Sequence, residues 1–150
     1  MRLSHQVQYA ICGAFDLAYN GQGQPVQIRV ISQRQAIPGR YLEQIFQRLR
    51  RAGLVSSKRG PGGGYTLSRS PAHISLRDVV EAVEGPLADA LRMKPAPVGE
   101  KPTYRPDFLW AQLADRFSSV LDETSLETLC SAAARADVER AEGDPPMYFI

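Results

Sequence analysis

Residues 40–69 read RYLEQIFQRLRRAGLVSSKRGPGGGYTLSR, and this stretch decides the fold. Its first part carries apolar side chains at helical spacing and predicts a helix over about residues 39–52. Gly53 is the glycine expected just past the end of that helix. LVSSK and YTLSR follow as two short strand-like runs, with RGPGGG between them. Glycine and proline between such runs are typical of a hairpin turn. A phosphate-binding loop would need Gly-Lys-Ser/Thr leading into a helix, and no such triplet follows.

Two more helices are predicted before this stretch. Residues 3–19 place apolar side chains at helical spacing, and Asn20 and Gly21 are typical of a helix end. After the loop GQGQP, a second helix over about residues 26–35 stops at AIPG. Three short helices followed by a hairpin is the order of a winged helix-turn-helix domain, whose third helix is the candidate for the major groove and whose hairpin is the wing.

The sequence after the hairpin predicts a helix that packs on the domain, a connector and a helix for dimerisation. Ser75 is a candidate N-cap for a helix in ISLRDVVEAVEG, and KPAPVGEKPTYRP at residues 94–106 predicts an irregular connector. From residue 107 to about 122, apolar side chains repeat at helical spacing. Because helix-turn-helix proteins usually read two half-sites as dimers, we expect this helix to form a dimer interface.

A last helix is expected over about residues 125–141, where Thr124 and Glu127 form a candidate capping box. The predicted fold class is mainly α with a small β-hairpin. The expected divisions are a winged helix-turn-helix DNA-binding domain, a proline-rich connector, dimerisation helices and a C-terminal tail, at residues 1–87, 88–106, 107–142 and 143–150.

Composition narrows the class of protein. No apolar run in the 150 residues approaches the roughly 20 residues of a membrane span. The first twenty residues lack the uninterrupted apolar core of a signal peptide, so we expect a cytoplasmic protein. Cys12 and Cys130 lie far apart and match no metal-ligand spacing. We expect both to be buried as small apolar residues, without a disulfide.

Charge is distributed unevenly along the chain. Residues 1–70 hold ten basic and two acidic side chains, a net charge of +8, whereas residues 71–150 carry −6. A segment this basic suggests a polyanionic partner. The exposed face of the third helix is expected to carry Gln44 and Gln47, which suit adenine, and arginines, Arg48 among them, which suit guanine. Arg59 at the wing tip suits a narrow minor groove.

Three segments together resemble the Rrf2 family of bacterial transcriptional regulators: RLSHQVQYAICGAFDLA, residues 40–69, and ISLRDVVEAVEGPL. The resemblance implies a homodimeric repressor or activator that binds double-stranded DNA. It places the DNA contacts on the start of the first helix, the recognition helix and the wing, at Arg2, Ser4, Arg40, Tyr41, Gln44, Arg50, Arg51, Arg59, Gly60 and Pro61.

The spacing of Tyr41 also suits the core. Pro38-Gly39 departs from the family, which more often has a serine there, so the recognition helix loses a side-chain cap.

Well-known members of this family sense iron–sulfur status through three cysteines in the connector, and this connector has none. Because iron–sulfur clusters are held chiefly by thiolates, we expect no cofactor and no metal. A cluster that used His5, His73, Cys12 or Cys130 is the alternative; a surface or cap position is the simpler interpretation of the two histidines. The chain therefore resembles a cluster-free branch, whose cysteine-metabolism repressor is controlled by O-acetylserine sulfhydrylase (cysteine synthase).

The tail is similar to peptides that enter the active site of that enzyme, because serine acetyltransferases also end in isoleucine. Met147, Tyr148, Phe149 and Ile150 follow two prolines that would hold an extended peptide. Packing of this tail on the dimer helix and no function at all are the other interpretations. The main hypothesis is a homodimeric regulator of cysteine genes. The alternatives are an iron–sulfur or redox sensor of the same fold and an enzyme, for which no catalytic set is recognisable.

Overall fold

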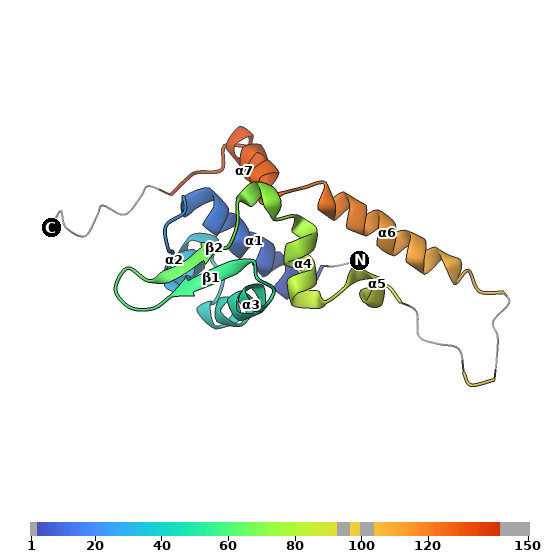
Figure 1. Ribbon diagram of the computed structural model, residues 1–150. Coiled ribbons are helices and arrows are strands. Elements are labelled where there is room, and N and C mark those ends of the chain that lie inside the picture. The colour runs from blue at the N-terminus through green and yellow to red at the C-terminus, as the bar shows by residue number, and fades with distance from the viewer. Residues whose placement is uncertain (1–2, 93–96, 100–103, 142–150) are drawn as a thin grey trace.

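The computed structural model describes residues 3–92, 97–99 and 104–141. It is mostly helical with one two-stranded antiparallel sheet, which confirms the predicted fold class (Figure 1). The elements, in chain order, are α1 (His5–Asn20), α2 (Ile28–Gln35), α3 (Gly39–Arg51), β1 (Val55–Lys58), β2 (Gly64–Leu67), the 3₁₀ turn η1 (Pro71–His73), α4 (Leu76–Glu84), α5 (Leu87–Ala90), α6 (Phe108–Asp122) and α7 (Leu126–Arg135). None of these helices is long and apolar enough to cross a membrane.

Helix α1 is the centre of the domain, because it contacts α2, α3, α4, α7 and β2. The largest fully buried side chains are Phe46, Ile31, Leu42, Ile45 and Leu49. Four of these five belong to α3, so this helix supplies a large part of the core. At Gly13 of α1, an added Cβ would lie 2.8 Å from the ring of Phe46. Glycine therefore allows α1 and α3 to approach closely.

The wing is fixed at its base. Strands β1 and β2 pair in the register Val55↔Leu67 to Lys58↔Gly64. Next to Gly64, the backbone of Tyr65 exchanges hydrogen bonds of 2.8 and 2.9 Å with that of Val26, in the loop before α2. The ring of Tyr65 packs against Phe46, with centroids 5.0 Å apart. The hairpin is thus attached both to the loop before α2 and to the core.

Helix α4 begins as the sequence predicts. The Ser75 hydroxyl accepts from the Asp78 N–H and the Asp78 carboxylate accepts from the Ser75 N–H, which forms a capping box. For α7 the prediction is one residue off: Ser125 is the N-cap, and its hydroxyl accepts from the Thr128 N–H. The carbonyl of Thr124 instead accepts from the N–H of Leu76, which ties the start of α7 to the start of α4.

Helix α7 ends at Arg135, earlier than the expected 141. After its last turn the chain changes direction at Asp137, which has a φ of +57°, and Val138 bonds back to Ala133. Residues 138–141 then lie against α1, which a continued helix could not do. Glu142 and the whole tail of residues 143–150 lie outside the described residues, as does part of the connector.

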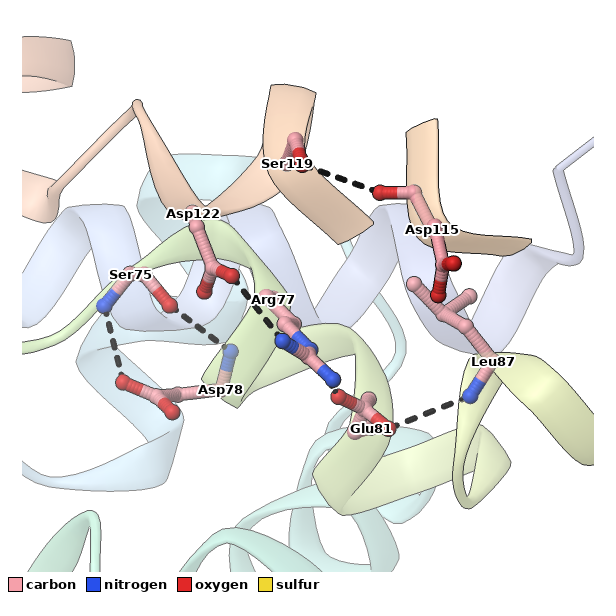
Figure 2. Close-up of polar contacts among 8 residues, drawn as sticks. All are labelled: Ser75, Arg77, Asp78, Glu81, Leu87, Asp115, Ser119 and Asp122. Carbon is pink, nitrogen blue, oxygen red and sulfur yellow. Dashed lines mark hydrogen bonds and ion pairs between the residues drawn. The ribbon is translucent and has the colours of Figure 1, made fainter. Parts of the chain in front are cut away.

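Helices α4, α5 and α6 share one polar cluster (Figure 2). Arg77 of α4 pairs with Glu81 one turn later at 2.5 Å and with Asp122 of α6 at 2.9 Å. These carboxylates raise the pKa of the Arg77 guanidinium, Glu81 first, because both accept hydrogen bonds from it. The other oxygen of Glu81 accepts from the N–H of Leu87 at the start of α5. The cluster therefore holds the beginning of α5 and the end of α6 on α4.

Candidate nucleic-acid interface

The two faces of α3 differ sharply in chemistry. Leu42, Ile45, Phe46 and Leu49 are buried. The opposite face carries exposed basic and amide side chains, at Arg40, Gln44, Gln47, Arg50 and Arg51. Pro38 is the N-cap and supplies no side-chain hydrogen bond, as the sequence predicts. This arrangement leaves a helix whose outward side chains suit base edges and phosphates.

Tyr41 lies at the surface, not in the core. Its side chain is 39% exposed, so the interpretation that places it inward with Leu42 is wrong. The guanidinium of Arg40 lies 4.9 Å from the Tyr41 ring centroid and donates to its hydroxyl at 3.2 Å. On the other side, the Tyr41 ring is 6.1 Å from that of Tyr9 in α1. Tyr41 therefore holds Arg40 at the beginning of α3.

Arg48 differs from the other arginines of α3. The sequence places it on the exposed face, whereas the structure shows it half-buried. Its Nη1 donates to Gln6 Oε1 at 2.7 Å and to the carbonyl of Val83 at 3.2 Å. Arg48 thereby connects α3 to α1 and α4. Helical spacing alone gives no sign of this position, because the two acceptors lie far away in sequence.

Ser4 acts first as the N-cap of α1. Its hydroxyl accepts from the N–H of Val7 and donates to the carboxylate of Glu84 in α4. Any contact to DNA from Ser4 would share the hydroxyl with these two partners. Arg2, the other expected contact at this end, lies outside the described residues.

The wing presents its tip to solvent. Arg59, Gly60 and Pro61 are all exposed, and the turn is closed by a hydrogen bond of 2.9 Å from the Gly63 N–H to the Gly60 carbonyl. Gly60 has a φ of +88°, a conformation that other residues rarely adopt. In Figure 1, α3 lies along the lower edge of the domain with the hairpin beside it, and α7 lies on the opposite edge. The expected helix and wing contacts are thus brought to one side.

The donor set does not fit a thiolate-ligated cluster. The chain has two cysteines and two histidines, and none of them lies in residues 88–106. Among the residues that the structure describes, no group of three or more His, Cys, Asp or Glu could hold a metal ion. Burial raises the pKa of the thiols of Cys12 and Cys130, which are half-buried rather than fully buried as expected. Both therefore favour the protonated thiol over the metal-binding thiolate.

Known proteins resemble this chain over nearly its whole length. The sequence model of the Rrf2 family, described as "Iron-dependent Transcriptional regulator", matches residues 3–132. The HTH-type transcriptional regulator IscR of Xenorhabdus nematophila is 40% identical over 96% of this chain and 88% of its own length. CymR, the global cysteine regulator of B. subtilis, has a solved structure with a TM-score of 0.70 and 34% identity over 88% of this chain and 98% of that one. The T. potens IscR structure has a TM-score of 0.72 and 32% identity over 99% and 96%.

The family model and the IscR sequence relative are named as transcriptional regulators, in agreement with the winged helix-turn-helix fold and with the expectation of a non-catalytic protein. The match of the family model over most of the chain, together with 40% identity to a curated member, shows that this protein belongs to the Rrf2 family of DNA-binding transcriptional regulators.

Proposed function

We propose that the protein is a homodimeric regulator that reads a specific operator with α3 in the major groove and the wing tip in an adjacent minor groove. The observation that carries this proposal is the outer face of α3, where Gln44, Gln47 and three arginines are exposed while the inner face fills the core. Amide side chains suit adenine and arginines suit guanine or phosphate. Arg59 extends the contact beyond the groove that α3 occupies.

The dimer is proposed from the surface of α6. Phe108, Phe117 and Val120 are 68%, 38% and 62% exposed, although they are large apolar residues. No described residue covers them. Exposed apolar patches of this kind mark interaction sites. A second copy that packs α6 against α6 would bury them and present two recognition helices to two half-sites.

Replacement of Gln44 with alanine is expected to weaken operator binding by about 1–3 kcal/mol if the amide reads a base. The operator is first selected from a random duplex library, and affinity is then measured by fluorescence anisotropy at one fixed salt concentration. The control is Ser131→Ala, an exposed polar residue of α7, which lies on the edge of the domain opposite α3 and should leave affinity unchanged. Failure to select any preferred sequence would overturn the proposal of specific DNA recognition.

The signal that controls this regulator is proposed on other grounds than DNA recognition. Curated relatives such as the one reported above are IscR proteins at 39–40% identity, which favours an iron–sulfur or redox signal over a cysteine signal. Among the solved structures the global cysteine regulator and the T. potens IscR are about equally similar, at 34% and 32% identity. The donor set of this chain argues against the cluster itself. Anaerobic reconstitution with iron and sulfide decides the point: visible absorbance that alters operator affinity supports the iron–sulfur alternative, whereas a colourless protein removes it.

Regulation of cysteine genes is the other proposal, with O-acetylserine sulfhydrylase as the partner of Met147, Tyr148, Phe149 and Ile150. Its support is the sequence of these residues and the similarity to the global cysteine regulator. They lie outside the described residues. Titration of the enzyme with the full chain and with a variant lacking Ile150 is the test. Loss of enzyme binding only in the shortened variant supports the proposal, and equal binding by both overturns it.

A further inference from the structure

A cavity of about 800 Å³ lies between α1, α2 and the segment that follows α7. The wall from α1 and α2 consists of Phe15, Asn20, Arg34 and Gln35. Residues 138–141 form the other wall. This volume falls within the range of small-molecule sites. It is separate from the outer face of α3 and from the wing tip.

The wall formed by residues 138–141 is held in place by α1. The hydroxyl of Tyr19 donates to the carbonyl of Val138 at 2.7 Å, and the N–H of Ala141 donates to Asn20 Oδ1 at 2.8 Å. Between these two bonds, the Arg140 guanidinium lies 4.5 Å from the centroid of the Tyr19 ring. The cavity therefore has two defined sides.

A single buried carboxylate positions the polar side chains of the opposite wall. Asp16 has no exposed surface. It accepts from Arg34 Nη2 at 2.6 Å and Arg34 Nε at 3.1 Å, from Gln35 Nε2 at 2.9 Å and from Asn20 Nδ2 at 3.3 Å. Groups held from behind in this way are pre-organised for a ligand in front of them.

Donors remain after Asp16 is satisfied. A guanidinium has five N–H groups, and Arg34 uses two of its own on Asp16. Gln35 retains its second N–H and its carbonyl oxygen. Arg140 supplies a further cation, and a carboxylate suits such a group of donors. The lining also contains the exposed carboxylate of Glu139, which suits an ammonium group.

The apolar part of the lining is small. The ring of Phe15, stacked on Tyr19 with centroids 4.9 Å apart, offers one flat surface. A ligand that matches the whole lining has a carboxylate, an ammonium group and a short apolar body. A free α-amino acid has these three parts.

The cavity adjoins the corner of the helix-turn-helix. Arg34 and Gln35 form the last turn of α2, and the chain then turns through Ala36, with a φ of +53°, towards α3. Ser32 holds this turn through hydrogen bonds with Ile37. Because α2 packs on α3, a ligand that holds the end of α2 also acts on the position of the recognition helix.

We propose that this cavity is an effector site for a free α-amino acid, whose carboxylate binds Arg34, Gln35 and Arg140 and whose ammonium group binds Glu139. Occupancy changes operator affinity through the end of α2. The effector function rests on the proposed DNA recognition, whereas the binding itself does not.

The test uses the full chain and each proteinogenic L-amino acid at millimolar concentration, screened by thermal unfolding and followed by calorimetry. At least one amino acid is expected to raise the unfolding midpoint, because a ligand that binds the native state stabilises it. Its N-acetyl derivative should bind about tenfold more weakly, because the ammonium group is lost. Glu139→Gln and Arg140→Ala should each weaken binding of the free amino acid by about tenfold.

Glu127→Gln and Arg135→Ala are the matched controls, since both residues are exposed on α7 and outside the cavity lining. They should leave calorimetric binding unchanged. The site is overturned if no amino acid binds or if Glu139→Gln and Arg140→Ala bind as the parent does. Binding without any change in operator affinity overturns the effector function alone. If the chain binds no DNA, the proposed function fails, while calorimetry still decides on the site.

Discussion

Replacement of Asp16 with alanine is expected to lower the free energy of unfolding by about 1–3 kcal/mol, because the donors around it lose their acceptor while Arg34, whose side chain is 26% exposed, keeps access to solvent. The Asp16 carboxylate is fully buried, and the Arg34 guanidinium holds it with two hydrogen bonds. Without the carboxylate, Arg34 and Gln35 lose the acceptor that ties α2 to α1. Urea unfolding followed by circular dichroism measures the change.

Two further variants sharpen this prediction. Glu43→Ala removes an exposed carboxylate from α3, outside the proposed α6 interface, and should change stability by no more than about 0.5 kcal/mol. The double variant Asp16→Leu with Arg34→Met removes the charges together, and it should recover much of the lost stability because no unpaired charge remains. A loss below about 1 kcal/mol for Asp16→Ala would contradict the importance of this pair.

Replacement of Arg59 with alanine is expected to reduce operator affinity by about 1–3 kcal/mol without loss of stability. Arg59 is exposed at the wing tip, and the wing is anchored at its base by Val26 and Tyr65. The variant therefore removes the guanidinium and leaves the hairpin in place. Anisotropy with the selected operator measures the affinity, and thermal unfolding checks the fold.

Changes to the DNA sequence of the operator separate the two ways in which Arg59 can bind DNA. If the guanidinium binds in a narrow minor groove, the loss of operator affinity should depend on the A·T content of the base pairs next to those that α3 contacts. A uniform loss over all duplexes would assign Arg59 to a phosphate. Arg135→Ala is the matched control, an exposed arginine at the end of α7, outside both the wing and the proposed α6 interface. An Arg59→Ala protein that binds as tightly as the parent would remove the wing from the interface.

The parts that the sequence predicts are those set by local patterns. The apolar spacing of α3, the glycine-rich turn after Lys58 and the cap at Ser75 each depend on residues within a few positions. Local patterns place a helix boundary one residue off where two neighbouring residues can both act as the N-cap. Ser125 and Thr124 are neighbouring candidate caps. In the structure this segment pairs with residues 74–76, through the Leu76 N–H to the Thr124 carbonyl and the Leu126 N–H to the Ile74 carbonyl, and Ser125 is the cap.

The cavity could not be predicted in this way. Asp16 lies 18 residues from Arg34, and Asn20 lies 121 residues from the Ala141 N–H that it binds. On the predicted first helix, Asp16 is only one acid among apolar side chains. Folding brings α2, with Arg34 and Gln35, next to Asp16, and brings residues 138–141 next to Asn20 at the end of α1. Arg48 escaped prediction for the same reason.

The cluster at Arg77 and Glu81 bears on which changes of chain length the fold can accept. One helix holds both the start of α5 and the end of α6. The chain from Leu87 to Asp122, which includes α6, therefore leaves from and returns to a common support. The entropic cost of closing such a loop grows slowly with its length. Insertions and deletions between Ala90 and Phe108 should thus be tolerated by the fold, because the supports of α5 and α6 on α4 do not depend on the length of this segment.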